Sequence, residues 1–157
     1  MEGLRFMEWS GQDVNQVAVV PYRFDEGDGQ ICLITASSGK WTFPKGCVKS
    51  AEGLKATAEQ EAWEEAGVRG AVEEEPFGCC ELVKGGTTFR AALFLMQVAT
   101  IADKWPEKKL RRRIWVGAAA AASLLELPSQ HAALDEAWRR IEWIRAGRTT
   151  DSHPRRS

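Results

Sequence analysis

The stretch of residues 46–68 constrains this chain more than any other part of its sequence. It reads GCVKSAEGLKATAEQEAWEEAGV, a glycine-led loop followed by a helical pattern that stops at a glycine. Glu61, Glu64 and Glu65 are spaced i, i+3 and i+4, so they share one face of the predicted helix. Neighbouring like charges repel, so these glutamates either stay in water or receive a cation. Carboxylate oxygens suit Mg²⁺ or Mn²⁺.

The spacing of the whole stretch resembles the signature of the Nudix hydrolases, Gly-x5-Glu-x7-Arg-Glu-U-x-Glu-Glu-x-Gly-U, in which U is aliphatic. At background usage of roughly 7% per residue type, the six fixed Gly and Glu positions match by chance about once in 10⁷ windows. This rarity favours the resemblance over a merely solvated acidic face. The matching residues are Gly46, Glu52, Glu61, Glu64, Glu65, Gly67 and Val68, with Ala62 as a small U.

The resemblance implies a division of roles within the stretch. Glu61 and Glu65 are expected to bind Mg²⁺, with Mn²⁺ as an alternative, together with a backbone carbonyl at Lys45 or the residue after it. Glu64 is expected to accept the proton of the attacking water. Glu52, the second candidate catalytic residue, either binds the metal through water or only holds the loop.

Gln60 departs from the signature, which has arginine at this position. In relatives that arginine is expected to pair with a signature carboxylate and to orient the ligands. Glutamine donates a hydrogen bond but has neither a charge nor a bidentate fork. Two interpretations stay open: a tolerated substitution with weaker ligand orientation, or substantially reduced hydrolysis.

Segments outside the signature carry the substrate prediction. They resemble the diphosphoinositol polyphosphate phosphohydrolase branch of plant and microbial type, whose members also cleave diadenosine polyphosphates. The segments are Trp41-x-Phe43-Pro44-Lys45-Gly46, Gly67-Val68-Arg69-Gly70, Trp105-Pro106-Glu107 and Arg111-Arg112-Arg113-x-Trp115. Such substrates are densely anionic, so lysine and arginine suit them. The predicted substrate-binding residues are Arg23, Ser38, Lys40, Lys45, Arg90, Arg111 and Arg113.

These observations predict a metal-dependent hydrolase of phosphoanhydride bonds in diphosphoinositol polyphosphates or diadenosine polyphosphates. One alternative is a broader pyrophosphohydrolase of nucleoside-diphosphate-linked compounds or RNA 5′ ends. Another, from a different class, is a weakly active Nudix fold that binds a phosphate ligand or a protein. The expected partner is a polyphosphorylated small molecule, with nucleic acid relevant only as an RNA 5′ end, and we expect a monomer.

Composition restricts the setting of the protein. The 157 residues carry a net charge of −1, which gives no bulk attraction to nucleic acid or membranes. No stretch approaches 18 consecutive apolar residues and the N-terminus lacks an apolar leader pattern, so we expect neither secretion nor membrane insertion. Four cysteines without paired CxxC spacing favour reduced thiols. We therefore expect the cytoplasm, with the nucleus as a second location.

Hydrophobic periodicity and turn residues predict the order of elements. Strands are expected at 16–23, 31–36, 68–72, 77–83, 87–99 and 113–116, and helices at 53–67, at 117–125 and from Pro128 onward. This order predicts an α/β (α+β) fold, which the resemblance sharpens to the Nudix α/β/α sandwich with a mixed β-sheet between helical layers. We expect a loosely docked lead-in at 1–15, a single Nudix hydrolase domain at 16–146 and a disordered basic tail at 147–157.

Overall fold

A mixed β-sheet forms the centre of the protein in the computed structural model, which describes residues 4–49 and 53–147. The described strands are β1 (Leu4–Met7), β2 (Gln16–Asp25), β3 (Asp28–Thr35), β4 (Trp41–Thr42), β5 (Lys45–Cys47), β6 (Val68–Val72), β7 (Gly78–Lys84), β8 (Thr87–Ile101) and β9 (Arg113–Val116). Their order is β1-β7-β8-β2-β3-β4, while β5 pairs with β2, β6 with β8 and β9 with β3. The sheet is mixed because β2 and β8 run parallel and the other described pairs run antiparallel.

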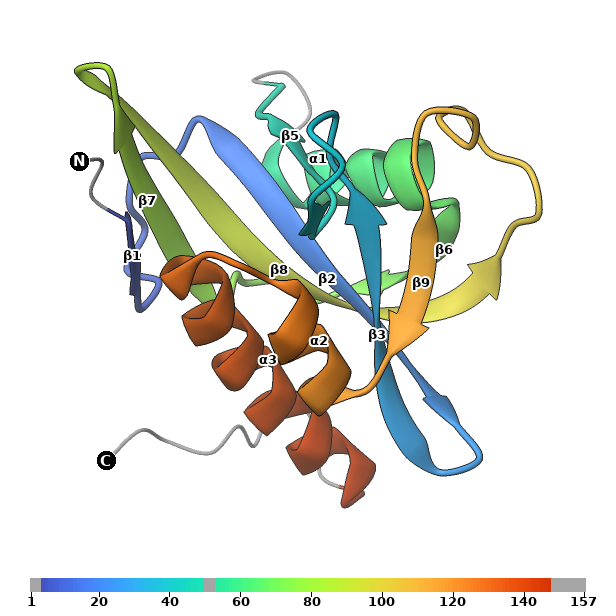
Figure 1. The fold of residues 1–157 in the computed structure, drawn as a ribbon. Coiled ribbons are helices and arrows are strands. Elements are labelled where there is room, and N and C mark those ends of the chain that lie inside the picture. The colour runs from blue at the N-terminus through green and yellow to red at the C-terminus, as the bar shows by residue number, and fades with distance from the viewer. Residues whose placement is uncertain (1–3, 50–52, 148–157) are drawn as a thin grey trace.

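Two helical layers cover the two faces of this sheet (Figure 1). One layer is α1 (Gly53–Glu61) with its π-helical continuation η1 (Ala62–Ala66), and the other is α2 (Ala118–Leu124) with α3 (Pro128–Arg145). Val19 and Ala58 belong to the buried core on the α1 side, and Leu33 and Ala137 belong to the core on the α3 side. The predicted α/β/α sandwich with a mixed sheet is therefore confirmed.

β2 lies in the middle of the sheet, and its residues 17–22 form a continuous buried run. Val17 and Val19 face the α1 core, whereas Ala18 and Val20 face the α3 core, and all four are at most 5% exposed. A strand covered on both faces reads as a continuous apolar run. The predicted strand at 16–23 is confirmed, and it extends two residues further.

The N-terminal lead-in is more firmly docked than its sequence predicts. Residues Leu4–Met7 form β1, which pairs antiparallel with β7 at the edge of the sheet, and Phe6 packs against the α3 core. Four residues are too few to show a strand periodicity, and the edge of β7 supplies the hydrogen-bonding partner. The predicted disordered tail lies, from residue 148 onward, outside the described residues.

The signature helix begins and ends where the sequence predicts, but its last turn is unusual. It starts at Gly53 and stops before Gly67, which has a φ of 67° and donates its N–H back to Ala62 and Trp63. A left-handed glycine at this position is a common helix end. The π-helical turn before it was not predicted, and such turns are frequent at functional sites.

The cysteines carry free thiols, with Cys32 and Cys79 buried, Cys80 partly buried and Cys47 exposed. Burial raises the pKa of Cys32 and of Cys80 to about 12, so both stay protonated. Within residues 4–49 and 53–147, no helix is both long and apolar enough to span a bilayer.

Candidate active site

The loop before the signature helix lies directly against the first of the three glutamates. Gly46, in β5, has no side chain, and a Cβ there would overlap the Glu61 carboxylate and come within 2.9 Å of its Cγ. Glu61 is only 8% exposed. Burial raises its pKa, and the negative charge of Glu64 raises it further. The leading glycine of the signature is therefore needed because the glutamate occupies the space beside its Cα.

Glu65 lies on the same side of the helix and contacts the same loop. Its Oε1 accepts a hydrogen bond of 3.1 Å from the backbone N–H of Lys45, and its Oε2 lies 3.4 Å from Nη2 of Arg111. Burial raises the pKa of Glu65 to about 7, although the Lys45 N–H and the Arg111 charge both act to lower it. Metal-free Glu65 is therefore poised between its protonated and ionised forms near neutral pH.

Glu64 and Gln60 form a pair one helical turn apart. Nε2 of Gln60 donates a hydrogen bond of 2.8 Å to Oε1 of Glu64. Position 60 therefore still orients a signature carboxylate, as the resemblance implied for the arginine, but without a positive charge. Glu64 is partly exposed, so its carboxylate is more accessible to water than those of Glu61 and Glu65.

A loop between β8 and β9 closes over the end of the signature helix. The Trp105 indole N–H donates to the Glu65 carbonyl at 3.2 Å, and the Glu107 N–H donates to the Glu64 carbonyl at 3.0 Å. The Trp105 ring leaves no room for a Cβ on Gly67, whose nearest ring atom would lie 2.6 Å away. These bonds satisfy carbonyls at the helix end and fix the backbone of the two glutamates.

Glu107 is a site residue that the sequence reasoning did not identify. Its carboxylate lies 2.7 Å from Nε of Arg111, and its negative charge contributes to the raised pKa of Glu61 and Glu65. The i, i+4 spacing of Glu107 and Arg111 was the available signal, but only the chain's return to the helix end places the pair at this site.

The donor set fits a divalent cation. Two buried carboxylates, those of Glu61 and Glu65, face the Lys45–Cys47 strand, and hard oxygen ligands of this kind suit Mg²⁺. Among the described residues, no group donates a hydrogen bond to the Glu61 carboxylate, so its lone pairs are available for a cation. Among all the described residues, the signature glutamates included, no three His, Cys, Asp or Glu side chains gather into a metal site. A cation at this site therefore needs backbone or substrate oxygens as further ligands. Glu52, the other signature glutamate, lies outside the described residues.

The predicted basic residues do not gather into one patch. Arg113 donates to the backbone carbonyls of Ala66 at 2.9 Å and Ala102 at 3.0 Å, and its guanidinium stacks on Trp105. Arg23 stacks on Trp115. These contacts engage both guanidinium groups with protein groups, and the binding of substrate by Arg113 and Arg23 stays a prediction.

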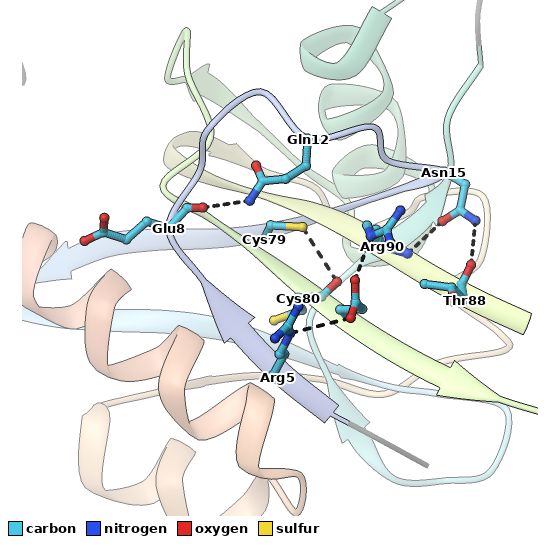
Figure 2. Close-up of polar contacts among 9 residues, drawn as sticks. Arg5, Glu8, Gln12, Asn15, Cys79, Cys80, Thr88 and Arg90 are labelled. Carbon is cyan, nitrogen blue, oxygen red and sulfur yellow. Dashed lines mark hydrogen bonds and ion pairs between the residues drawn. The ribbon is translucent and has the colours of Figure 1, made fainter.

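Lys40 and Arg90 also have carboxylate partners. Lys40 pairs with Glu126 at 3.6 Å, and Ser38 accepts a hydrogen bond from the Lys40 N–H at 3.4 Å. Arg90 pairs with Glu81 at 2.7 Å, and Arg5 contacts the same carboxylate (Figure 2). Of the predicted substrate-binding residues, the structure thus brings Lys45 and Arg111 to the signature glutamates.

A cleft opens beside Lys45 on the sheet face that α3 covers. It encloses about 630 Å³, including the part open to solvent. Its lining is mainly apolar and amide-bearing, with one lysine and one glutamate as its charged residues. The lining residues are Gln16, Ala18, Thr42, Phe43, Lys45, Cys80, Glu81, Leu82, Phe89, Ala91, Leu93, Leu127, Ser129, Gln130 and Ala133.

Comparison with known proteins agrees with this fold. The family model described as the NUDIX domain matches residues 14–137. The chain is 34% identical over 128 residues to Nudix hydrolase 17, mitochondrial, of Arabidopsis thaliana, which covers 76% of this chain and 70% of that relative. It is 35% identical over 109 residues to Nudix hydrolase 18, mitochondrial, of the same plant. That alignment covers 64% of this chain and 62% of the relative.

Solved structures show the same fold at low sequence identity. A C. elegans Ap4A hydrolase aligns with a TM-score of 0.68 and 19% identity, covering 83% of this chain and 99% of that one. The Bacillus subtilis pyrophosphohydrolase BsRppH aligns with a TM-score of 0.63 and 14% identity, and the alignment covers 90% of this chain and 89% of that one.

The fold, the glutamate-bearing helix and the family match together define a Nudix domain, and the chain belongs to the Nudix family. It is a Nudix hydrolase, an enzyme of pyrophosphate-bond hydrolysis. The expected family is therefore confirmed, whereas the diphosphoinositol polyphosphate branch stays a prediction.

Proposed function

We propose that this chain hydrolyses phosphoanhydride bonds with a divalent cation, Mg²⁺ or Mn²⁺, held by Glu61 and Glu65. The observation that carries this proposal is the burial of both carboxylates against the Lys45–Cys47 strand, with Gly46 leaving space for Glu61. The Lys45 carbonyl is the proposed backbone ligand. When bound, the cation neutralises charge on the phosphoryl oxygens and favours ionisation of a bound water.

The protein groups then have distinct tasks. Glu64 is the proposed proton acceptor, because it is the most accessible of the three signature glutamates and Gln60 holds one of its oxygens. The Lys45 N–H fixes one oxygen of Glu65. The loop that carries Trp105 and Glu107 keeps the end of the helix in place, so that the carboxylates do not have to reorganise.

The cleft beside Lys45 favours a substrate with a nucleoside on one side of the polyphosphate. Phe43 and Phe89 offer aromatic surface, and Gln16 and Gln130 offer amide donors and acceptors. Lys45 is the one basic residue of the described lining, and its backbone N–H contacts Glu65. Ligand pockets with a mainly apolar lining commonly hold a largely apolar group that a few polar contacts fix in place. We therefore infer a dinucleoside polyphosphate, such as a diadenosine polyphosphate, as the substrate class.

Diphosphoinositol polyphosphates are the second candidate. They would place dense negative charge where the cleft has the carboxylate of Glu81, and the nearby Arg5 and Arg90 are already paired with that carboxylate. The feature that favours them is the set of segments around Lys45 and Arg111, which resemble those of that branch. RNA 5′ ends are a third class for the same assay.

A substrate panel with Mg²⁺ tests the proposal. Diadenosine polyphosphates, diphosphoinositol polyphosphates and 5′-triphosphorylated RNA are compared at matched concentrations by phosphate release. We expect the highest kcat/KM on the dinucleotide. Phe89→Ala is expected to raise KM for that substrate, while Val83→Ala, on the neighbouring strand and outside the cleft, leaves it unchanged. Release from none of the three would favour a phosphate-binding or protein-binding module.

A further inference from the structure

We propose that Arg111 is the residue that positions Glu65. The Nudix signature has an arginine where this chain has Gln60, and Arg111 supplies the missing positive charge from a loop distant in sequence. This inference rests on the metal site proposed above. It assigns Arg111 a role toward the ligand set in place of the predicted role toward substrate phosphates.

The signature helix provides no cation of its own for its glutamates. Neither the last turn of α1 nor that of η1 contains a basic residue. Lys55, earlier on the helix, pairs with Glu74 at 2.6 Å. Gln60 reaches Glu64 with one neutral hydrogen bond, so Glu65 has no charged partner on its own helix.

Arg111, in the loop before β9, is the charged partner of Glu65. Its Nη2 lies 3.4 Å from Oε2 of Glu65, its Nε lies 2.7 Å from Oε1 of Glu107, and its Nη1 donates to the Thr35 carbonyl at 3.0 Å. Three guanidinium nitrogens thus face acceptors from three separate segments. A planar, permanently charged fork makes such a triple contact, whereas a lysine ammonium is a single point charge.

The backbone around Arg111 is itself anchored to the end of β3. The Arg112 N–H donates to the Thr35 hydroxyl at 2.9 Å, and the Thr35 N–H donates to the Arg112 carbonyl at 3.1 Å. The guanidinium is therefore held by the pairing of β3 with β9 and reaches Glu65 as a fixed group. With its three nitrogens engaged, Arg111 has few donors left for a substrate phosphate.

The positioning role and a substrate-binding role predict opposite effects on cation binding. An arginine that only binds phosphate repels a cation in the neighbouring site, so its removal would raise KM and leave Mn²⁺ affinity unchanged or tighter. An arginine that orients a ligand would, when removed, loosen Glu65 and weaken Mn²⁺ binding.

The test compares wild type, Arg111→Gln and the matched control Arg112→Gln, which removes the same charge from an exposed side chain stacked on Trp41. Mn²⁺ affinity is measured by electron paramagnetic resonance without substrate, alongside kcat, KM and melting temperature. We expect Arg111→Gln to weaken Mn²⁺ binding by about tenfold or more and to lower kcat with little change in KM. We expect Arg112→Gln to behave as wild type.

Unchanged or tighter Mn²⁺ binding in Arg111→Gln would overturn the inference and leave the proposed metal site standing. Absence of Mn²⁺ binding in wild type would overturn both. If Arg111→Gln does not fold, Arg111→Lys, which keeps the charge and loses the fork, serves as the variant and is expected to weaken Mn²⁺ binding relative to wild type. Wild-type Mn²⁺ affinity in the lysine variant would refute the requirement for the fork.

A second experiment places Gln60→Arg in both backgrounds. If the two positions share one role, the added arginine should raise kcat and Mn²⁺ affinity in Arg111→Gln by a clearly larger factor than in wild type, because wild type already has its charge. An equal factor in both backgrounds would show independent effects and refute the shared role.

Discussion

Replacement of Gly46 by alanine tests the geometry of the site most directly. A Cβ at this position would come within 2.9 Å of Glu61 Cγ and overlap the carboxylate beyond it. Non-bonded carbon atoms are best separated by about 3.5–4.0 Å. The Cγ must therefore retreat by more than half an ångström, and the carboxylate at its end must move on the order of 1 Å.

This displacement is expected to affect activity more than stability. A shift of about 1 Å in a reacting group costs on the order of 10²-fold in rate, which corresponds to about 2.7 kcal/mol in the activation free energy. The colliding atoms belong to the end of one side chain, so Gly46→Ala should cost about 1–3 kcal/mol of stability, as overpacking typically does.

The assay is Mg²⁺-dependent phosphate release from a dinucleoside polyphosphate, with Mn²⁺ affinity and thermal unfolding measured on the same samples. Gly117→Ala is the control, because Gly117 has no atom within 4 Å of a Cβ and lacks a positive φ. We expect it to keep wild-type activity. A folded Gly46→Ala protein with activity close to that of wild type would refute the role assigned to the Gly46–Glu61 contact.

Three further predictions concern the residues around the helix end. The pKa of Glu65 is raised to about 7 from an ordinary 4.5, so the metal-free protein should lose stability on the order of 1–3 kcal/mol as pH rises through that interval. Glu65→Gln should abolish turnover without a large drop in melting temperature, and it should remove this slope in urea titrations; an unchanged slope would contradict the assignment. Trp105→Phe removes the hydrogen bond to the Glu65 carbonyl and should cost about 1 kcal/mol of stability and lower kcat, whereas wild-type values for both would show that the bond is dispensable. Arg113→Lys loses the paired contacts with two carbonyls and should lower the melting temperature with KM unchanged. A raised KM would instead support the substrate-binding role predicted from the sequence.

Local sequence patterns were sufficient for most of the elements. The apolar run of β2, the turn at Gly85 and Gly86 between β7 and β8, and the glycine after the signature helix each reflect a backbone or burial requirement of a few neighbouring residues. The lead-in was the exception, because β1 exists through its pairing with β7. The π-helical turn has no local signal either, and the closing loop bonds directly to it.

The residues of the site also fall into those that the sequence predicted and those that only the tertiary structure brought together. Spacing alone placed Glu61, Glu64 and Glu65 on one helix face, since helix geometry relates residues three and four apart. The resemblance to the Nudix signature singled out Gly46, and the tertiary structure shows why a side chain does not fit there. Only the tertiary structure decided which charges surround the glutamates. Arg111 and Glu107 lie more than forty residues from Glu61 in sequence and reach the glutamates because β9 pairs with β3, whereas Arg113, two residues beyond Arg111, is directed to backbone carbonyls. Which side of a strand or loop a charge occupies depends on long-range pairing, and a single sequence does not specify that pairing.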